Sequence, residues 1–351
     1  MKKALSFILG IILLFCGTTL AQNVIDFEDM LTDVLADDVY QSNTPFFSGV
    51  LIQTINNVTG NITGWPVVVR AHDNPIVPGD CGVVIPDYVG TVPAFSSNQC
   101  TGNSMNNYPV GSGFNSLSDT SEGIPPNPVG PRKQDGFLIN FGYPVMDFSL
   151  IIVDWGDWLP GGSGENTWPS YVELIANDND GVIVGSDKTP DLISQTVSRD
   201  AARANGIISL EIEGGGIREV EVRFRGFIDP GVTIDDIIFT SLNIDIKPGS
   251  DANRINSNGH GVIPVAILGS ADFDVTTLDP STVMMDGQGV RMKGKSGRAG
   301  SYEDVNDDGF IDLVVHIEDG DVYTTGDTVG TVTAETCEGE LIGGQDSISI
   351  I

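Results

Sequence analysis

The sequence predicts an all-β protein made of two β-sandwich domains, the first jelly-roll-like and the second smaller. Its 351 residues suffice for roughly two domains of about 150 residues each. The chain contains 43 Gly and 19 Pro, which favour many turns and few long helices. Short apolar runs recur between these turns. Hydrophobic residues make up 40% of the chain, which is enough to build packed cores.

Residues 1–21 have the pattern of a secretory signal peptide. Two N-terminal lysines precede the apolar run 5–16, and the small-x-small pattern of 19–21 suits cleavage before Gln22. The alternatives are a membrane anchor and lipidation at Cys16. The apolar run is short for a hydrocarbon layer of about 30 Å, and Phe15 is bulky where a lipidation signal has a small residue. We therefore expect a secreted protein, extracellular or at the cell surface.

Residues 22–241 are expected to form the first sandwich. Its expected strands are residues 24–28, 49–54, 65–70, 137–141, 148–153, 171–176, 182–184, 207–212, 219–227 and 234–239. The segment 177–181 ends in Asp-Gly and predicts a hairpin between two of these strands. Residues 192–204 fit one short helix. So many short strands with turns between them are typical of a sandwich.

The segment 73–135 interrupts this pattern and is interpreted as a Pro/Gly-rich surface insertion. It holds nine of the 19 prolines and has little periodicity. Cys81 and Cys100 lie within it, and in an oxidising compartment we expect them to form a disulfide; two free thiols are the alternative. Cys337 is left over and is expected to be a small buried residue in a strand at 331–337.

Residues 242–351 are expected to form the second, smaller sandwich. Its expected strands are residues 243–246, 261–268, 282–285, 313–317, 328–333 and 347–351.

The charge of the chain excludes several kinds of partner. There are 17 Lys and Arg against 48 Asp and Glu, a net charge of −31. Phosphate recognition needs a basic patch, so neither nucleic acid nor an anionic membrane is an expected partner. No apolar run after residue 21 is long enough to insert into a membrane. Carboxylate oxygens instead suit divalent cations.

The clearest motif is a D-x-N-x-D-G-x-x-D loop at 304–312, which predicts calcium binding. The candidate ligands are the side chains of Asp304, Asn306, Asp308 and Asp312 and the main-chain carbonyl of Phe310. Gly309 permits the sharp turn that brings such ligands together. The twelfth position is Val315, not Glu, and the following residues alternate like a strand, so the loop is not an EF-hand. The alternative is an acidic turn that binds only water.

Residues 242–351 resemble a β-module common in secreted bacterial proteins. The resemblance is carried by N-I-D-I-K-P-G-S at 243–250, G-V-I-P-V-A-I-L-G-S at 261–270 and E-D-V-N at 303–306. It continues through residues 273–283 and the closing Asp346-Ser347. The resemblance implies an extracellular β-module with a calcium loop, usually appended to other domains, and no catalytic activity.

The first domain resembles jelly-roll domains of the galactose-binding and carbohydrate-binding-module type. The residues that carry this are 26–28, 178–181 and 233–239. The resemblance implies that the first and last strands lie close together and share a structural calcium. Glu28 and Asp236 are the candidate ligands, with solvated edge carboxylates as the alternative.

A cluster of aromatic residues follows one of the expected strands. Its members are Trp155, Trp158, Trp168 and Tyr171. Flat aromatic rings in loops suit stacking on sugar rings, so this cluster is a candidate glycan site. The alternative is a hydrophobic lid on the sandwich.

No catalytic motif emerges from the chain. The three histidines, His72, His260 and His316, are far apart and lack metal-ligand spacing. We therefore expect a secreted, calcium-binding, non-enzymatic surface or matrix protein that is adhesive or glycan-binding. Its expected partners are an extracellular polysaccharide, a cell-surface glycan or copies of itself. The alternatives are a self-assembling subunit of an extracellular layer or filament and a polysaccharide-active enzyme.

Overall fold

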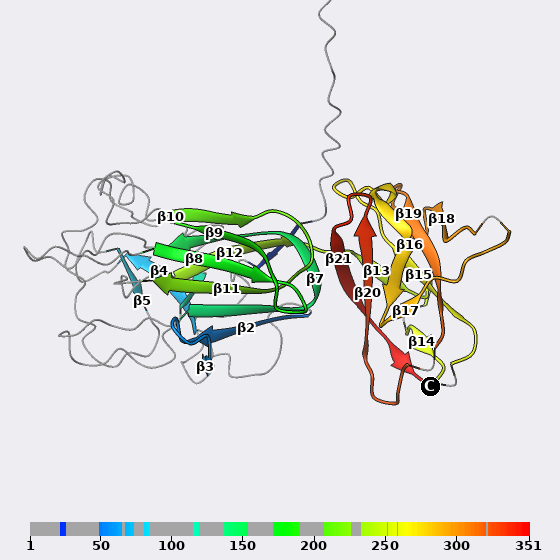
Figure 1. Cartoon of the computed structure of the whole chain (residues 1–351), viewed down its shortest axis with the longest axis horizontal. Helices are drawn as coiled ribbons and strands as arrows, with labels where there is room; N and C mark the ends of the chain where they lie inside the picture. The colour runs from blue at the N-terminus through cyan, green and yellow to red at the C-terminus, as the bar shows by residue number, and fades with distance from the viewer. Residues whose placement is uncertain are drawn as a thin grey trace, which may run out of the picture.

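The computed structural model describes residues 22–25, 49–64, 67–73, 81–84, 115–118, 136–153, 171–189, 207–225 and 233–351, the last range without 251, 258, 296 and 321. Strands make up 62% of these residues, and none of them is in an α-helix. The predicted all-β sandwich class is therefore confirmed (Figure 1). The signal peptide expected at 1–21 and the helix expected at 192–204 lie outside the described residues. Within them, no helix is long and apolar enough to cross a membrane.

The first sandwich is built around one long strand. Its strands are β1 (Gln22–Ile25), β2 (Val50–Ile55), β3 (Ile62–Gly64), β4 (Val67–Asp73), β5 (Cys81–Val84), β6 (Asn115–Ser118), β7 (Gly136–Val153), β8 (Tyr171–Asn177), β9 (Ile183–Lys188), β10 (Ile207–Ile212), β11 (Ile217–Arg225) and β12 (Thr233–Thr240). The first half of β7 pairs with β2 and β11, and its second half pairs with β10 and β12. One strand thus belongs to both layers.

The strand β7 bends sharply at Asp147. Its pairing with β11 reaches Val145, and its pairing with β12 begins at Met146. The rings of Phe141 and Phe148 meet edge to face with centroids 6.2 Å apart. Seven residues of straight strand would span roughly 23 Å at about 3.3 Å per residue, so the strand must fold back on itself. Asp147 has φ 49°, a left-handed conformation that aspartate tolerates better than most residues.

The structure corrects two expectations about this half of the chain and confirms a third. The strands expected at 137–141 and 148–153 are one continuous strand. The segment 73–135, interpreted as an insertion, contributes β5 and β6, and β6 pairs with both β4 and β12. The hairpin at 177–181 forms as expected, because Asp178 Oδ1 accepts the N–H groups of Asp180 and Val182 at 2.9 Å each.

The second sandwich has two four-stranded sheets. Its strands are β13 (Ile244–Ile246), β14 (Arg254–Ile255), β15 (Val262–Ile267), β16 (Leu278–Met285), β17 (Gln288–Gly289), β18 (Gly300–Glu303), β19 (Asp312–Glu318), β20 (Val329–Thr336), β21 (Leu341–Ser347) and β22 (Ser349–Ile350). The sheet orders are β13-β15-β19-β18 and β17-β16-β20-β21. Fully buried residues from both sheets, such as Val265 and Val315 facing Met285 and Val332, form one core.

Cys337 does not lie where the sequence predicted. The structure places it in the turn after β20, where it is an exposed free cysteine rather than a buried strand residue. The strand ends at Thr336 because Thr336 N–H and O pair with Glu340 O and Gly339 N–H in a tight turn.

The two sandwiches pack against each other through β7 and β21. A Cβ atom at Gly343 would lie 2.9 Å from Cδ of Pro144, so only glycine allows β21 to approach this closely. The N–H of Leu242 donates to Gly343 O at 2.8 Å, and the N–H of Gly216 donates to Leu341 O at 2.7 Å. Met146 of β7 is buried in the core of the second sandwich. The bend in β7 therefore also forms the joint between the two sandwiches, which is the contact of β7 with β21 and its neighbouring residues.

Replacement of Asp147 tests this joint. Asp147→Val should destabilise the protein by about 1–3 kcal/mol, because a β-branched residue is strained at positive φ. It would also lose the hydrogen bond that Asp147 Oδ1 accepts from Gly214 N–H at 3.1 Å. Asp147→Asn keeps an acceptor and tolerates the same φ, so its stability in a urea titration should stay near wild type. Equal losses in both variants would contradict the proposed strain.

The carboxyl of Glu340 makes the joint pH-sensitive. Burial, followed by the charges of Asp147 and Glu338, raises its pKa above the ordinary value. The folded state therefore binds this proton more tightly than the unfolded chain, and this site favours folding more as the pH falls from neutrality towards about 4.3. Glu340→Gln should raise the melting temperature at pH 7. The difference in melting temperature between this variant and wild type should become smaller at lower pH. Glu335→Gln, at an exposed position of β20, is the control. An identical shift in both variants would contradict this assignment.

Candidate functional site

The candidate metal loop, residues 304–312, connects two neighbouring strands of the second sandwich. Strands β18 and β19 pair antiparallel up to Glu303 and Asp312, so the loop closes a regular ladder. Asp307 and Gly309 adopt left-handed conformations with φ 60° and 90°, which turn the chain sharply within a few residues. The strand-loop-strand context expected from the alternating residues after 312 is therefore present, and no helix flanks the loop.

Three of the predicted ligands gather on the inner side of this loop. The N–H of Asp308 lies 3.2 Å from Oδ1 of Asp304 and 3.2 Å from Oδ1 of Asn306. The Asn306 amide donates to Asp308 Oδ2 at 2.8 Å, and the N–H of Gly309 donates to Asp304 Oδ2 at 3.0 Å. Oxygens that share one donor must lie close together. The side chains of Asp304, Asn306 and Asp308 therefore converge.

Asp312, the fourth predicted side-chain ligand, anchors the loop to the rest of the sandwich. Its carboxylate is fully buried. Oδ2 accepts the N–H of Val305, and Oδ1 accepts the N–H of Gly269 beyond the end of β15, both at 2.8 Å. Gly269 fits because a Cβ atom there would lie 2.2 Å from the Ile311 carbonyl oxygen. Asp312 thus holds both ends of the loop and a neighbouring turn in one arrangement.

The chemistry of the loop fits a hard cation. Carboxylate, amide and carbonyl oxygens are the ligands that calcium takes, and Asp304, Asn306 and Asp308 bring such oxygens together. In the described part of the chain, no three His, Cys, Asp or Glu side chains gather closely enough to hold a metal ion by themselves. Binding would therefore also need the Asn306 amide oxygen or the Phe310 carbonyl, and the contact between Asn306 and Asp308 would have to open.

The other predicted metal site is only partly described. Strands β1 and β12 pair antiparallel, with Ile25 opposite Ile237, so the first and last strands of the first sandwich do lie side by side. Asp236 is half-buried at an irregularity of β12, with φ 43°. Glu28 lies outside the described residues. The shared calcium therefore stays a prediction.

The structure describes only part of the predicted glycan site and of the predicted disulfide. Trp155, Trp158, Trp168 and Cys100 lie outside the described residues. Tyr171, at the start of β8, is half-buried, and the Lys188 ammonium lies 5.3 Å from its ring centroid. Cys81 begins β5.

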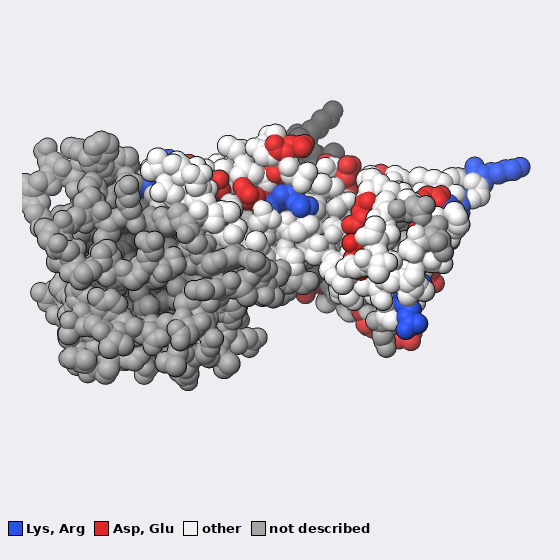
Figure 2. Space-filling view, turned by 90° about the horizontal axis from the view of Figure 1, so that it is seen from below, with Lys and Arg blue, Asp and Glu red and all other residues white. Residues whose placement is uncertain are grey.

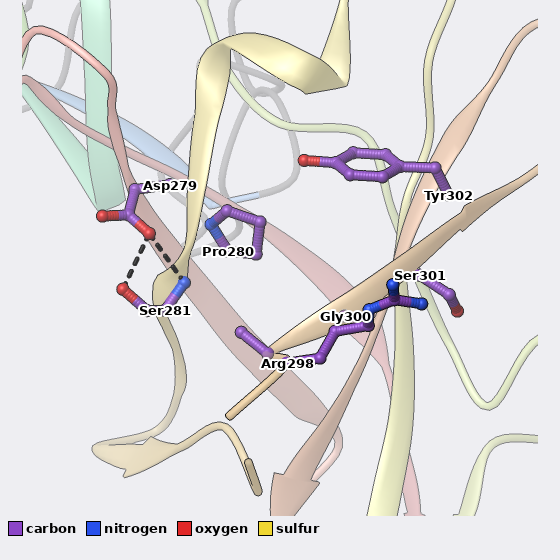
Figure 3. A pocket seen from close by; sticks show the side chains of 8 residues that line it. Asp279, Pro280, Ser281, Arg298, Gly300, Ser301 and Tyr302 are labelled. Carbon is purple, nitrogen blue, oxygen red and sulfur yellow. Dashed lines mark hydrogen bonds between the residues drawn. The ribbon is translucent and has the colours of Figure 1, made fainter. Parts of the chain in front are cut away.

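A surface pocket of about 510 Å³ on the second sandwich was not anticipated from the sequence. Its lining residues are Asp279, Pro280, Ser281, Arg298, Ala299, Gly300, Ser301 and Tyr302. They come from the start of β16 and from β18 with the residues before it (Figure 3). The two segments are about twenty residues apart and carry no shared motif. The concentration of basic residues just before β18 was the one feature of the sequence that could have pointed to this pocket.

No model of a protein family matches the chain, and no curated protein is significantly similar to it.

The anchoring role of Asp312 can be separated from metal binding. Asp312→Ala leaves two backbone N–H groups without their carboxylate and should destabilise the second sandwich by about 2–5 kcal/mol even in chelator. The control is Asp307→Asn, which removes one exposed charge from the same loop in a conformation that asparagine tolerates. Urea unfolding in EGTA measures both. A wild-type midpoint for Asp312→Ala would show that the buried carboxylate is not an anchor.

Proposed function

We propose that this chain is a secreted, calcium-stabilised, non-enzymatic binding protein of the cell surface or extracellular matrix, adhesive through glycan contacts. The observation that carries the calcium part is the convergence of three side chains in a loop whose closing residue, Asp312, is buried and anchored. Asp304 and Asn306 both accept the N–H of Asp308, and the Asn306 amide donates to the Asp308 carboxylate. Because these side chains already converge, a cation needs mainly the opening of the contact between Asn306 and Asp308, which limits the cost of binding.

The charge of the chain supports the same proposal. Five carboxylates lie between Glu303 and Asp312, in a protein with a net charge of −31. Like charges at this spacing repel one another, and a bound divalent cation offsets that repulsion. Extracellular modules bind calcium through weak sites of this kind, with dissociation constants up to about a millimolar. Together with the signal-like residues 1–21, this favours work outside the cell.

The adhesive part rests on different residues. Glycan contact is proposed from the aromatic cluster after β7 and from exposed residues of the second sandwich. The proposal that the protein is not an enzyme has a separate basis, the lack of any catalytic motif in the sequence. A regular sandwich that presents loops and an edge strand is a rigid scaffold for weak, repeated contacts with a polymer.

Calcium binding should show as stabilisation of the full chain. Binding to the folded state alone raises the free energy of unfolding by about 2.7 kcal/mol at a calcium concentration 100 times the dissociation constant. The melting temperature should therefore be higher in calcium than in EGTA. The quantity to compare between variants is this calcium-dependent increment, because Asp308 Oδ1 also accepts the N–H of Phe310 at 2.8 Å and its loss lowers stability directly.

Two variants make the test specific. Asp308→Ala should abolish the increment, whereas Glu335→Ala, which removes an exposed carboxylate from β20, should keep it. Magnesium at the same concentration controls for screening by divalent ions. If wild type melts at one temperature in calcium and in EGTA, the calcium part of the proposal is wrong.

A further inference from the structure

A basic arm projects from the second sandwich between β17 and β18. Lys293 and Arg298 lie opposite each other in an antiparallel bridge, in which each donates its N–H to the other's carbonyl, at 2.9 and 3.1 Å. Arg291, Lys293, Lys295 and Arg298 lie within eight residues of a chain that has only 17 Lys and Arg. Figure 2 shows basic side chains at the projecting end of the second sandwich, with acidic side chains spread over both sandwiches. No other eight consecutive residues of the sequence contain four Lys or Arg.

Two of these four cations are held by the protein itself. Arg291 forms an ion pair with Glu318, and the Lys293 ammonium lies 3.1 Å from Nδ1 of His316. Burial and the charges of Lys293 and Arg291 lower the pKa of His316, so this imidazole accepts from the lysine as a neutral base. Lys295 and Arg298 form no ion pair with any described residue. Their charges are available to a ligand.

The unanticipated pocket lies at the base of this arm. Arg298 and Tyr302 both line the pocket, and Figure 3 shows Tyr302 reaching from β18 towards Pro280, with the Arg298 side chain below it beside Ser301. The Tyr302 side chain is 46% exposed, so a flat aromatic ring borders the opening. The volume of about 510 Å³ exceeds the lower limit of ordinary small-molecule sites, roughly 300 Å³.

An acceptor of hydroxyl hydrogens completes the lining. Asp279 Oδ1 accepts the N–H and the hydroxyl of Ser281 at 2.9 and 2.7 Å. These hydrogen bonds lower the pKa of Asp279, which keeps its carboxyl group an anion. The pocket thus combines an aromatic face, an unpaired guanidinium and a fixed carboxylate.

We propose that this pocket binds an acidic sugar, a uronic-acid residue of an extracellular polysaccharide. The Tyr302 ring stacks on the apolar face of the pyranose, Arg298 holds the carboxylate in a bidentate contact, and Asp279 accepts hydroxyl hydrogens. The inference deepens the glycan part of the proposed function and rests on it, but it does not need calcium at residues 304–312.

Two other ligands fit less well. A neutral sugar would leave the Arg298 charge without a partner. A nucleic acid binds through many phosphates at once and needs an extended basic surface, whereas the lining of this pocket offers one guanidinium, that of Arg298. One sugar residue in one shallow pocket binds weakly, so retention depends on the many identical units of a polymer.

Affinity electrophoresis of the full chain tests the proposal. Polygalacturonate in the gel, in EGTA to exclude calcium bridges, should retard wild type, whereas the neutral polymer dextran should not. Loss of a hydrogen-bonded charged contact costs tenfold or more in affinity, so Arg298→Ala should weaken the retardation about tenfold. Tyr302→Ala should also weaken it, and Tyr302→Phe, which keeps the ring, should keep most of it.

Arg254→Ala is the matched control, because it removes another exposed arginine from the same sandwich and Arg254 does not line the pocket. Melting curves show that each variant is folded. The proposal is overturned if wild type is not retarded, if Arg254→Ala and Arg298→Ala lose retardation equally, if dextran retards wild type equally, or if a single-stranded oligonucleotide binds as well. A normal calcium increment with no retardation would refute this site and leave calcium binding intact.

Discussion

The bend of β7 at Asp147 is the constraint on which most of the architecture depends. Because this one strand pairs with β2 and β11 before the bend and with β10 and β12 after it, both layers of the first sandwich have their register fixed by the same chain segment. The bend also switches which residues point inwards. Phe141 and Phe148 face the first core, while Met146, between them, enters the second. In a straight strand Met146 and Phe148, two residues apart, would lie on the same face and enter the same core.

The second sandwich uses one buried carboxylate for a similar purpose. Asp312 begins β19, ends the ladder with β18, and binds the N–H groups of Val305 and Gly269. A buried charge is tolerated only where hydrogen bonds compensate for the lost hydration. The fold thus keeps this carboxylate because the 304–312 loop and the turn at Gly269 both depend on it. It follows that the residue has a structural role whether or not a cation is present, and that sequence spacing alone cannot separate the two roles.

The elements predicted correctly from the sequence are those whose residues form a clear local pattern. Strands with strong apolar alternation, such as β10 and β12, were predicted almost to the residue. Strands β18 and β21 were missed because Gly300, Gly343 and Gly344 hide the alternation, although close backbone packing is the reason for those glycines. The continuity of β7 was missed because Asp147 and Gly142 look like turn residues. The loop at 304–312 was found because its motif is contiguous, whereas the pocket joins residues 279–281 to 298–302, and only the sheet brings them together.

The loop and the pocket share an edge strand, which offers a physical route for coupling between their two proposed ligands. Tyr302 belongs to β18 and Asp304 follows two residues later, so roughly 7 Å of strand separates the pocket wall from the first candidate ligand. Strand β18 has only one neighbour in its sheet, β19, and their ladder ends at Asp312. An edge strand held on one side is freer to move than a central one. A cation bound between Asp304 and Asp308 would restrain the end of β18 that Asp312 also holds, through the N–H of Val305. The conformational freedom that Tyr302 loses on binding a sugar would then be smaller, so the two ligands would favour each other's binding without touching.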